Sequence, residues 1–267
     1  MKRRFLTVVV ATGIVILLGA WTASAQWLDI RLAGTPRTPD GKPNMSAPVS
    51  KTPDGKPDLS GVWRAADGKY LANIGADEGE PPFQPWAEAK IKAMTPVELE
   101  LSKSSVNCMP RGLPAIWLQN PYSTVIVHTP TMMAQLYEVL NNWRLVYTDG
   151  RPVPKDPEPW FHGTSTTHWE GDTLVVNSSG FDERTYVMPT GWFHSDAMKV
   201  TERYTRPSKN YLIVQITVDD PKVLAKPWTS APRRWTLGNG EVYEFYCTNN
   251  HELDELGKLK DQESYGK

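Results

Sequence analysis

The chain has 267 residues, enough for one large domain or two small ones. Its 29 Lys and Arg residues nearly balance 30 Asp and Glu residues, so charge gives no reason to expect nucleic acid or an anionic membrane surface as a partner. Eleven Trp and ten Tyr residues favour β-strands and pockets for flat or apolar ligands.

The first 25 residues are typical of a cleavable secretory signal peptide. A basic start, Met1–Arg4, precedes the apolar run Phe5–Ala20, and the small residues Ala23 and Ala25 suit signal peptidase. The alternative is a membrane anchor, but the apolar run is shorter than the roughly 20 residues that a spanning helix needs. We therefore expect a periplasmic or secreted protein with no membrane span after cleavage.

Residues 26–60 are expected to form an extended leader rich in Pro and Gly. The hexapeptide Thr38–Pro43 returns as Thr52–Pro57. Pro-Asp-Gly favours turns, and two copies are too few for a solenoid. We interpret the segment as a strap or linker ahead of a single β-barrel domain, residues 61–267.

One helical hairpin is predicted near residues 83–104. Phe83–Met94 is rich in helix formers, and Pro96 starts a second short helix. Thr95, with Glu98 three residues later, predicts an N-cap. We expect the hairpin to connect two parts of a sheet, with a lid as the alternative.

From residue 122 onward, strand formers alternate with turn residues. Strands are predicted at Ser123–His128, Thr131–Leu140, Trp143–Thr148, Met198–Arg206, Tyr211–Val218, Arg233–Leu237 and Glu241–Cys247. Asp149-Gly150 and Glu170-Gly171-Asp172 are predicted hairpin turns. A short C-terminal helix is expected at His251–Lys258. The predicted fold is mainly β, an antiparallel meander closed into a barrel, with a sandwich as the alternative.

The two cysteines, Cys108 and Cys247, both lie in the exported part of the chain. Because export supplies an oxidising environment, we predict a disulfide bond between them. The alternative is two separate buried thiols. A bond here would stabilise the fold by about 4–5 kcal/mol in the chain-entropy model.

Several motifs resemble those of a large group of secreted bacterial proteins that have no established reaction. These motifs are Asp58–Trp63, His168–Val176, Gly180-Phe181, His194–Ala197, Val200–Tyr204, Val218–Pro221 and Pro227–Thr229. The match covers about residues 35–250 and implies no particular chemistry.

A second resemblance is to the lipocalin and fatty-acid-binding barrels. Gly61-Val62-Trp63 looks like their Gly-x-Trp at the first strand. The early helical pair, the Trp-Glu-Gly-Asp-x-Leu hairpin and the following Glu-Arg-Tyr come in a similar order. The resemblance implies a barrel whose interior holds a small apolar molecule. The chain departs from those barrels in its greater length and in the segment Cys108–Pro114.

Candidate lining residues for such a cavity combine aromatic rings with a few charged groups. They are Trp63, Trp143, Tyr186, Trp192, Tyr204, Glu138 and Arg111.

Two acidic residues are predicted to lie on apolar strand faces. Successive side chains of a strand point to opposite faces. This alternation places Glu202 on one face with Met198, Val200 and Tyr204. It likewise places Glu138 on one face with Met132, Ala134, Leu136 and Leu140. A carboxylate inside a barrel is costly unless it is paired or functional. The structural alternative for Glu202 is an ion pair with an inward arginine such as Arg144 or Arg111.

Acid–base catalysis is the enzymatic hypothesis. The residues proposed for it are His194, Asp196, Glu202, Asp182 and Arg203, with Glu183 and Tyr186 as further candidates. His194, oriented by Asp196 or Asp182, would move a proton near neutral pH, and Tyr186 or Arg203 would stabilise an oxyanion. Such a set suits an isomerase, hydratase or lyase acting on a small apolar or cyclic substrate. Ordinary loop hydrogen bonding is the alternative for each residue.

A metal site is a weaker hypothesis. His162, His168 and His194, with Asp196, would ligate a metal such as zinc if their loops met at one rim. No close spacing such as His-x-His supports this, so no cofactor is predicted. The sequence also lacks a nucleophile elbow, a phosphate-binding Gly-rich loop and a dinucleotide fingerprint.

The function predicted from sequence is an exported barrel that binds a small hydrophobic or aromatic molecule in an interior cavity. The alternatives are an acid–base enzyme of the same fold and a β-sandwich module that binds glycans or a protein through exposed Trp. No nucleic-acid partner is expected, and the sequence leaves the oligomeric state open.

Overall fold

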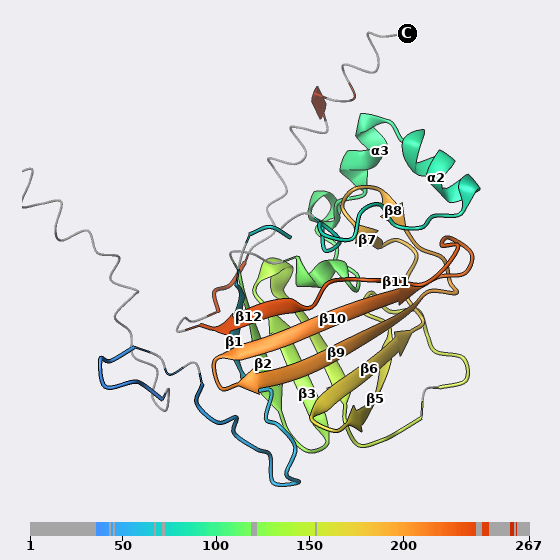
Figure 1. Cartoon of the computed structure of the whole chain (residues 1–267). Coiled ribbons are helices and arrows are strands. Elements are labelled where there is room, and N and C mark those ends of the chain that lie inside the picture. Colours follow the sequence, from blue (N-terminus) through green and yellow to red (C-terminus); the bar gives the residue numbers. More distant parts are fainter. Residues whose placement is uncertain are drawn as a thin grey trace, which may run out of the picture. The chain divides into compact units, whose positions relative to one another are not determined.

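Ten strands form one antiparallel sheet that curls into a nearly closed barrel (Figure 1). The computed structural model describes residues 36–42, 44, 46–66, 68–70, 73–118, 122–152, 154–238, 242–245, 257, 258 and 260. Among these residues, no helix has the length and apolar character needed to cross a membrane.

The barrel strands come from the whole described chain, and the longest connection is the one between β1 and β2. They are β1 (Gly61–Ala65), β2 (Ser123–His128), β3 (Met132–Tyr137), β4 (Asn142–Tyr147), β5 (Thr164–Glu170), β6 (Thr173–Ser179), β9 (Lys199–Ser208), β10 (Tyr211–Asp219), β11 (Trp228–Thr229) and β12 (Arg233–Leu237). A separate small hairpin joins β7 (Tyr186–Met188) to β8 (Trp192–Phe193).

Two meanders, joined by the pairing of β1 with β12, make up the sheet. The strand order is β4-β3-β2-β1-β12-β10-β9-β6-β5, and β11 pairs with β10. The two ends of this order approach each other, because the Thr167 hydroxyl on β5 donates to the Tyr147 carbonyl on β4 at 3.1 Å. The predicted mainly β, antiparallel barrel is confirmed, and its architecture is consistent with the lipocalin-like resemblance.

Strict alternation sets the interior face of the long strands. On β9, Val200, Glu202 and Tyr204 are fully buried, as the period-two pattern predicts. The face predicted for β3 is wrong. Gln135 faces the interior with 0% exposure, whereas Leu136 is 44% exposed. Both faces of β3 carry apolar residues, so hydropathy alone does not indicate which face lies inside.

The predicted helical hairpin is present between β1 and β2. It consists of α2 (Pro85–Lys92) and α3 (Pro96–Leu101). Thr95 and Glu98 form a reciprocal capping box: the Glu98 amide donates to Thr95 Oγ1 at 3.2 Å, and the Thr95 amide donates to Glu98 Oε2 at 2.8 Å. The predicted N-cap is therefore confirmed, and Figure 1 shows the pair at one end of the barrel.

Two other predicted elements differ in the structure. Asp149-Gly150 does not close a hairpin, because β4 pairs with β3 and β5 pairs with β6. Val242–Phe245 has no regular secondary structure, so a strand over 241–247 is not supported there. By contrast, Gly171 does lie in the predicted hairpin turn between β5 and β6.

Several predictions fall outside the described residues. The signal peptide, residues 1–25, lies there, as do residues 26–35 of the leader and most of the C-terminal helix. Cys247 also lies there, so its disulfide bond with Cys108 stays a prediction.

The first five residues of the repeated hexapeptide fold into the same loop in both copies. In each copy the Thr amide donates to the Lys carbonyl at 2.8 Å, the Gly amide donates to the Thr carbonyl at 2.8 Å, and the Gly φ is 81°. The second copy, Thr52–Pro57, lies two residues before the fully buried Leu59. We call residues 50–60, which include this second copy, the strap.

The two copies provide a matched stability test. Thr38 and Thr52 make equivalent side-chain bonds, to Asp40 and Lys42 and to Asp54 and Lys56, but Thr52 is only 8% exposed. We expect Thr52→Ala to lower the free energy of unfolding by about 1–2 kcal/mol, because it breaks a buried hydrogen bond. Thr38→Ala should cost less than about 0.5 kcal/mol. Urea denaturation measures both, and equal losses would show that the strap adds no stability through docking.

Candidate functional site

An ion pair lies in the middle of the barrel. Arg144 on β4 donates from Nη1 to Glu202 Oε2 on β9 at 2.7 Å, and the two side chains are 2% and 0% exposed. This is the pairing that the sequence offers as the structural alternative for Glu202. Two charges in an apolar interior are costly to desolvate, so their remaining polar atoms need partners.

Hydroxyl and amide groups supply most of those partners. Arg144 Nη2 donates to Ser165 Oγ and Ser178 Oγ, each at 2.8 Å. On the other side, the Tyr204 hydroxyl donates to Glu202 Oε1 at 2.8 Å and accepts from Gln135 Nε2 at 2.9 Å.

This chain of bonds continues across the barrel. The Tyr137 hydroxyl donates to Gln135 Oε1 at 2.7 Å. The network therefore links β3, β4, β5, β6 and β9. We call Gln135, Tyr137, Arg144, Ser165, Ser178, Glu202 and Tyr204, together with Trp117 described next, the interior cluster.

A short segment before β2 enters the barrel as a plug. It runs from Arg111 to Leu118 and carries Trp117, which is 5% exposed. Trp117 Nε1 donates to Glu202 Oε1 at 2.7 Å. Its ring packs against Trp235 and Tyr137, with centroid distances of 5.0 and 5.7 Å. The plug thus places an aromatic ring directly against the ion pair.

Close backbone approach and histidine contacts position the plug. A Cβ on Gly112 would lie 2.4 Å from Thr185 Oγ1, so only glycine fits at this point. His162 Nε2 lies 2.9 Å from the Arg111 carbonyl, and it must donate there because a carbonyl only accepts. Arg111 itself donates to the Leu118 carbonyl, which ties the two ends of the plug together.

Burial fixes the protonation states inside the barrel. It raises the pKa of Tyr137 and of Tyr204, so both phenols remain donors at neutral pH. Burial alone would lower the pKa of Arg144, but the Glu202 carboxylate raises it above its ordinary value. The Arg144–Glu202 pair therefore has no net charge, and each phenol beside it acts as a hydrogen-bond donor.

Two buried donors in this region lack partners. Among the described residues, neither Arg144 Nε nor Trp235 Nε1 has a hydrogen-bond partner. Each orphaned buried donor costs about 1–3 kcal/mol. Trp117 of the plug lies between the two side chains that carry these donors. Its ring packs on Trp235, and its indole N–H donates to Glu202, which also accepts from Arg144.

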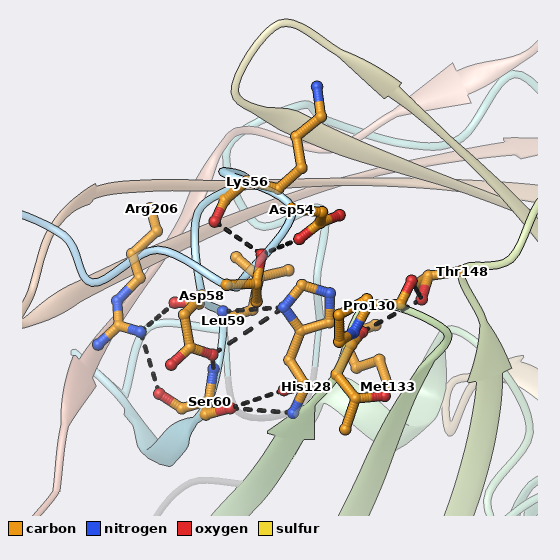
Figure 2. Close-up of polar contacts among 12 residues, drawn as sticks. Asp54, Lys56, Asp58, Leu59, Ser60, His128, Pro130, Met133, Thr148 and Arg206 are labelled. Carbon is orange, nitrogen blue, oxygen red and sulfur yellow. Dashed lines mark hydrogen bonds and ion pairs between the residues drawn. The ribbon is translucent and has the colours of Figure 1, made fainter.

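A second polar cluster lies where the strap meets the loop between β2 and β3 (Figure 2). The Leu59 amide donates to His128 Nδ1 at 3.4 Å, and the His128 amide donates to Ser60 Oγ at 2.9 Å. Arg206 donates to the Asp58 and Ser60 carbonyls. Burial lowers the pKa of His128 despite the nearby Asp58 carboxylate. These contacts bind the strap to the barrel.

The residues proposed for acid–base catalysis do not come together. His194 contacts Thr185 Oγ1 at 3.0 Å and the Ser195 carbonyl at 3.1 Å. Asp196 is an exposed residue that pairs with Lys222, and Asp182 holds Arg184 through both carboxylate oxygens. The expected dyad of His194 with Asp196 is therefore not formed, because these side chains take other partners.

Arg203 and Trp143 lie outside the barrel, contrary to the roles predicted for them. Arg203 faces outward on β9 and pairs with Glu170 at 2.7 Å. Trp143 faces outward on β4 and is 62% exposed. Each lies next to an inward cluster residue in sequence, so period two places it on the opposite face.

The other candidate lining residues are spread through the structure. Tyr204 belongs to the interior cluster, and Trp63 is fully buried with its Nε1 donating to the Leu59 carbonyl at 3.0 Å. Trp192 packs on Trp228 at 5.3 Å, and Tyr186 is half-buried on β7. Glu138 accepts from the Ser123 amide at 2.9 Å and so caps the start of β2.

The three histidines proposed as metal ligands have separate surroundings. His162 contacts the plug, His168 pairs with Glu170 on the surface, and His194 contacts Thr185. Among the described residues, no group of three or more His, Cys, Asp or Glu side chains is arranged to hold a metal.

Sequence reasoning missed five members of the cluster: Trp117, Gln135, Tyr137, Ser165 and Ser178. Trp117 lies in a segment without strand periodicity, and Gln135 and Tyr137 lie on the β3 face that was assigned outward. The apolar run Gly112–Leu118, which lies between Pro110 and Pro121, is the one sequence signal that a buried segment precedes β2.

Removing one partner of the ion pair should strongly destabilise the fold. We expect Arg144→Met to lower the free energy of unfolding by about 3–5 kcal/mol, because it leaves the Glu202 carboxylate buried without its counter-ion. The double variant R144M/E202L should recover part of this loss. Urea denaturation followed by circular dichroism measures both. A double variant no more stable than the single one would contradict the proposed charge imbalance.

His162 should make stability depend on pH. Burial, aided by the Arg144 charge, lowers the pKa of His162 to about 4. Between the ordinary His pKa of about 6.5 and this value, the unfolded chain binds a proton that the folded chain does not, so stability falls as pH falls. Above that window the ring is neutral in both states.

The variant His162→Gln keeps a side-chain donor for the Arg111 carbonyl but does not titrate. We expect its unfolding free energy to fall less than that of the wild type between pH 6.5 and 4, by up to about 3 kcal/mol. Urea denaturation at several pH values measures the slopes. His168→Gln is the surface control, because that side chain is 52% exposed. Parallel slopes for wild type and H162Q would refute the assignment.

Comparison with known proteins adds no relative to this picture: no family model, curated protein or solved structure matches the chain. The likeness to lipocalin-like barrels is thus one of architecture. The function has to be argued from the interior cluster itself.

Proposed function

We propose that this protein binds a small aromatic or apolar molecule that carries a neutral hydrogen-bond acceptor, inside the barrel beside Arg144. The barrel fold is compatible with a binding protein. The observation that carries the proposal is the pair of buried donors, Arg144 Nε and Trp235 Nε1, without partners among the described residues. With the proposed signal peptide, the protein would act in the periplasm or outside the cell.

The unpaired atoms indicate what the ligand must offer. Both are N–H groups, so they need an acceptor such as a carbonyl, ether or phenol oxygen. A ligand that supplies one would remove an unfavourable state of the free protein and gain affinity from it. Buried aromatic rings around them, those of Trp117, Tyr137 and Tyr204, suit a flat or apolar ligand body.

The charge balance disfavours an anionic ligand. Glu202 already neutralises Arg144 at 2.7 Å, so a ligand carboxylate entering the cluster would face a second carboxylate. A neutral acceptor meets no such repulsion. This distinguishes the proposed ligand from a fatty acid held through its charged head group.

Entry requires the plug to move. Trp117 fills the space between the ion pair and Trp235, and a single side-chain hydrogen bond, to Glu202, holds its indole. Displacing this ring would open the cluster while the surrounding strands keep their pairing. We therefore propose that the plug is the gate of the binding site.

Two matched naphthalenes test the proposal. We expect 2-acetylnaphthalene, which has a carbonyl acceptor, to quench Trp fluorescence saturably and to bind more tightly than 2-ethylnaphthalene, which has none. Trp235→Phe removes the free N–H but keeps an aromatic ring, and should weaken 2-acetylnaphthalene binding about fivefold, the worth of one hydrogen bond of about 1 kcal/mol. Calorimetric titration measures both affinities.

The exposed Trp143 supplies the control. Trp143→Phe changes the fluorescence background but should leave both affinities unchanged, because this ring lies on the outer surface. The proposal fails if neither compound binds. It also fails if both bind equally and W235F has no effect.

A further inference from the structure

Apart from Ser123 at the start of β2, the outer face of β2, β3 and β4 is apolar at its outward positions. Eight side chains form it: Val125, Val127, Met132, Ala134, Leu136, Trp143, Leu145 and Tyr147. None carries a charge, and only Tyr147 has a polar side-chain atom. We call this surface the apolar sheet face.

Strand register makes this face continuous. Val125, Leu136 and Trp143 lie directly opposite one another across the three strands. In the next row Val127, Ala134 and Leu145 do the same, and Met132 pairs with Tyr147 beyond them. Directly opposed side chains on one face of a sheet are in contact range, so the eight residues form one patch.

Exposure shows that the described fold does not cover this patch. Trp143 is 62% exposed, Val127 47% and Leu136 44%. Soluble monomers rarely expose a contiguous apolar patch larger than about 300–600 Å², and patches of that size are often functional. Four of the eight side chains, Val127, Leu136, Trp143 and Leu145, are exposed and lie in two adjacent rows across the three strands.

The rest of the barrel surface is different. The outward positions on β5 and β9 are mostly polar or charged: Thr164, Thr166, His168, Glu170, Lys199, Thr201, Arg203 and Thr205. Antiparallel sheets with one solvated face normally show this alternation of apolar and polar residues. The apolar sheet face therefore breaks a pattern that the same barrel follows elsewhere.

We infer that the apolar sheet face binds a second copy of this chain, in a symmetric dimer with the two sheets packed face to face. Two such patches would bury about 1,000 Å² in total, which is the lower bound for a specific interface and indicates a weak dimer. None of the eight side chains is charged, so two copies packed through this face bring no like charges together there.

The composition of the face fits a self-complementary contact. An exposed Trp beside aliphatic residues is typical of the centre of an interface, and charged groups at the rim complete it. Arg151 supplies such a rim group, because its guanidinium lies 3.6 Å from the centroid of the Tyr147 ring. Two sheets that pack face to face lie about 10 Å apart. At that distance, Leu136 and Trp143 would contact the same residues of the second copy.

Sedimentation velocity over a range of micromolar concentrations tests the inference. The protein, purified from cells expressing the full chain, should show a reversible monomer–dimer equilibrium. Leu136→Glu places a charge in the middle of the face and should raise the dimer dissociation constant at least about tenfold. Ile213→Glu is the matched control, because Ile213 faces outward on β10 between Thr205 and Arg234. It should leave the equilibrium unchanged.

Each other outcome overturns the inference. A wild-type protein that stays monomeric, or a dimer insensitive to L136E, would show that copies do not meet through this face. Equal effects of L136E and I213E would indicate general destabilisation, which thermal unfolding of both variants reveals. A last outcome is that the wild-type protein is a monomer in solution but co-sediments with vesicles of phosphatidylglycerol and phosphatidylethanolamine, whereas L136E does not. The face would then bind lipid and not a second copy.

Discussion

The barrel depends on the contact between Arg144 and Glu202. Arg144 lies on β4, at one end of the strand order, and its guanidinium reaches Ser165 on β5, at the other end. One arginine therefore ties the two edges of the sheet together from inside, while Glu202 on β9 holds it in place. A buried ion pair is weak evidence for stability, but here it spans the seam where the sheet does not pair with itself. This position explains why so many polar groups from different strands converge on it.

Both ends of the barrel are held by segments that come from outside the sheet. At one end the plug inserts Trp117 against Glu202, and at the other the strap contacts His128 and Arg206. Inside the barrel, the described side chains of the interior cluster hydrogen-bond and pack against one another. The proposed binding function then requires the plug to move. The indole of Trp117 is held to the strands through its hydrogen bond to Glu202.

The sequence predicted the elements whose signals are local. The capping box at Thr95 and the buried face of β9 follow from short-range chemistry and from period two, and both are confirmed. The inner face of β3 could not be predicted, because the apolar sheet face gives its outer side the same hydropathy. Trp117 was missed because an irregular segment has no periodicity to indicate burial. His194 and Asp196 are neighbours in sequence, but their side chains reach different elements, and only tertiary packing decides such partners.

The hexapeptide loop occurs twice with the same geometry, although one copy is docked on the barrel and the other is more exposed. The shape of this loop therefore comes from its own residues and not from what it touches. The same residues form the same turn in buried and in exposed surroundings, so substitutions beside either copy should leave the turn itself unchanged.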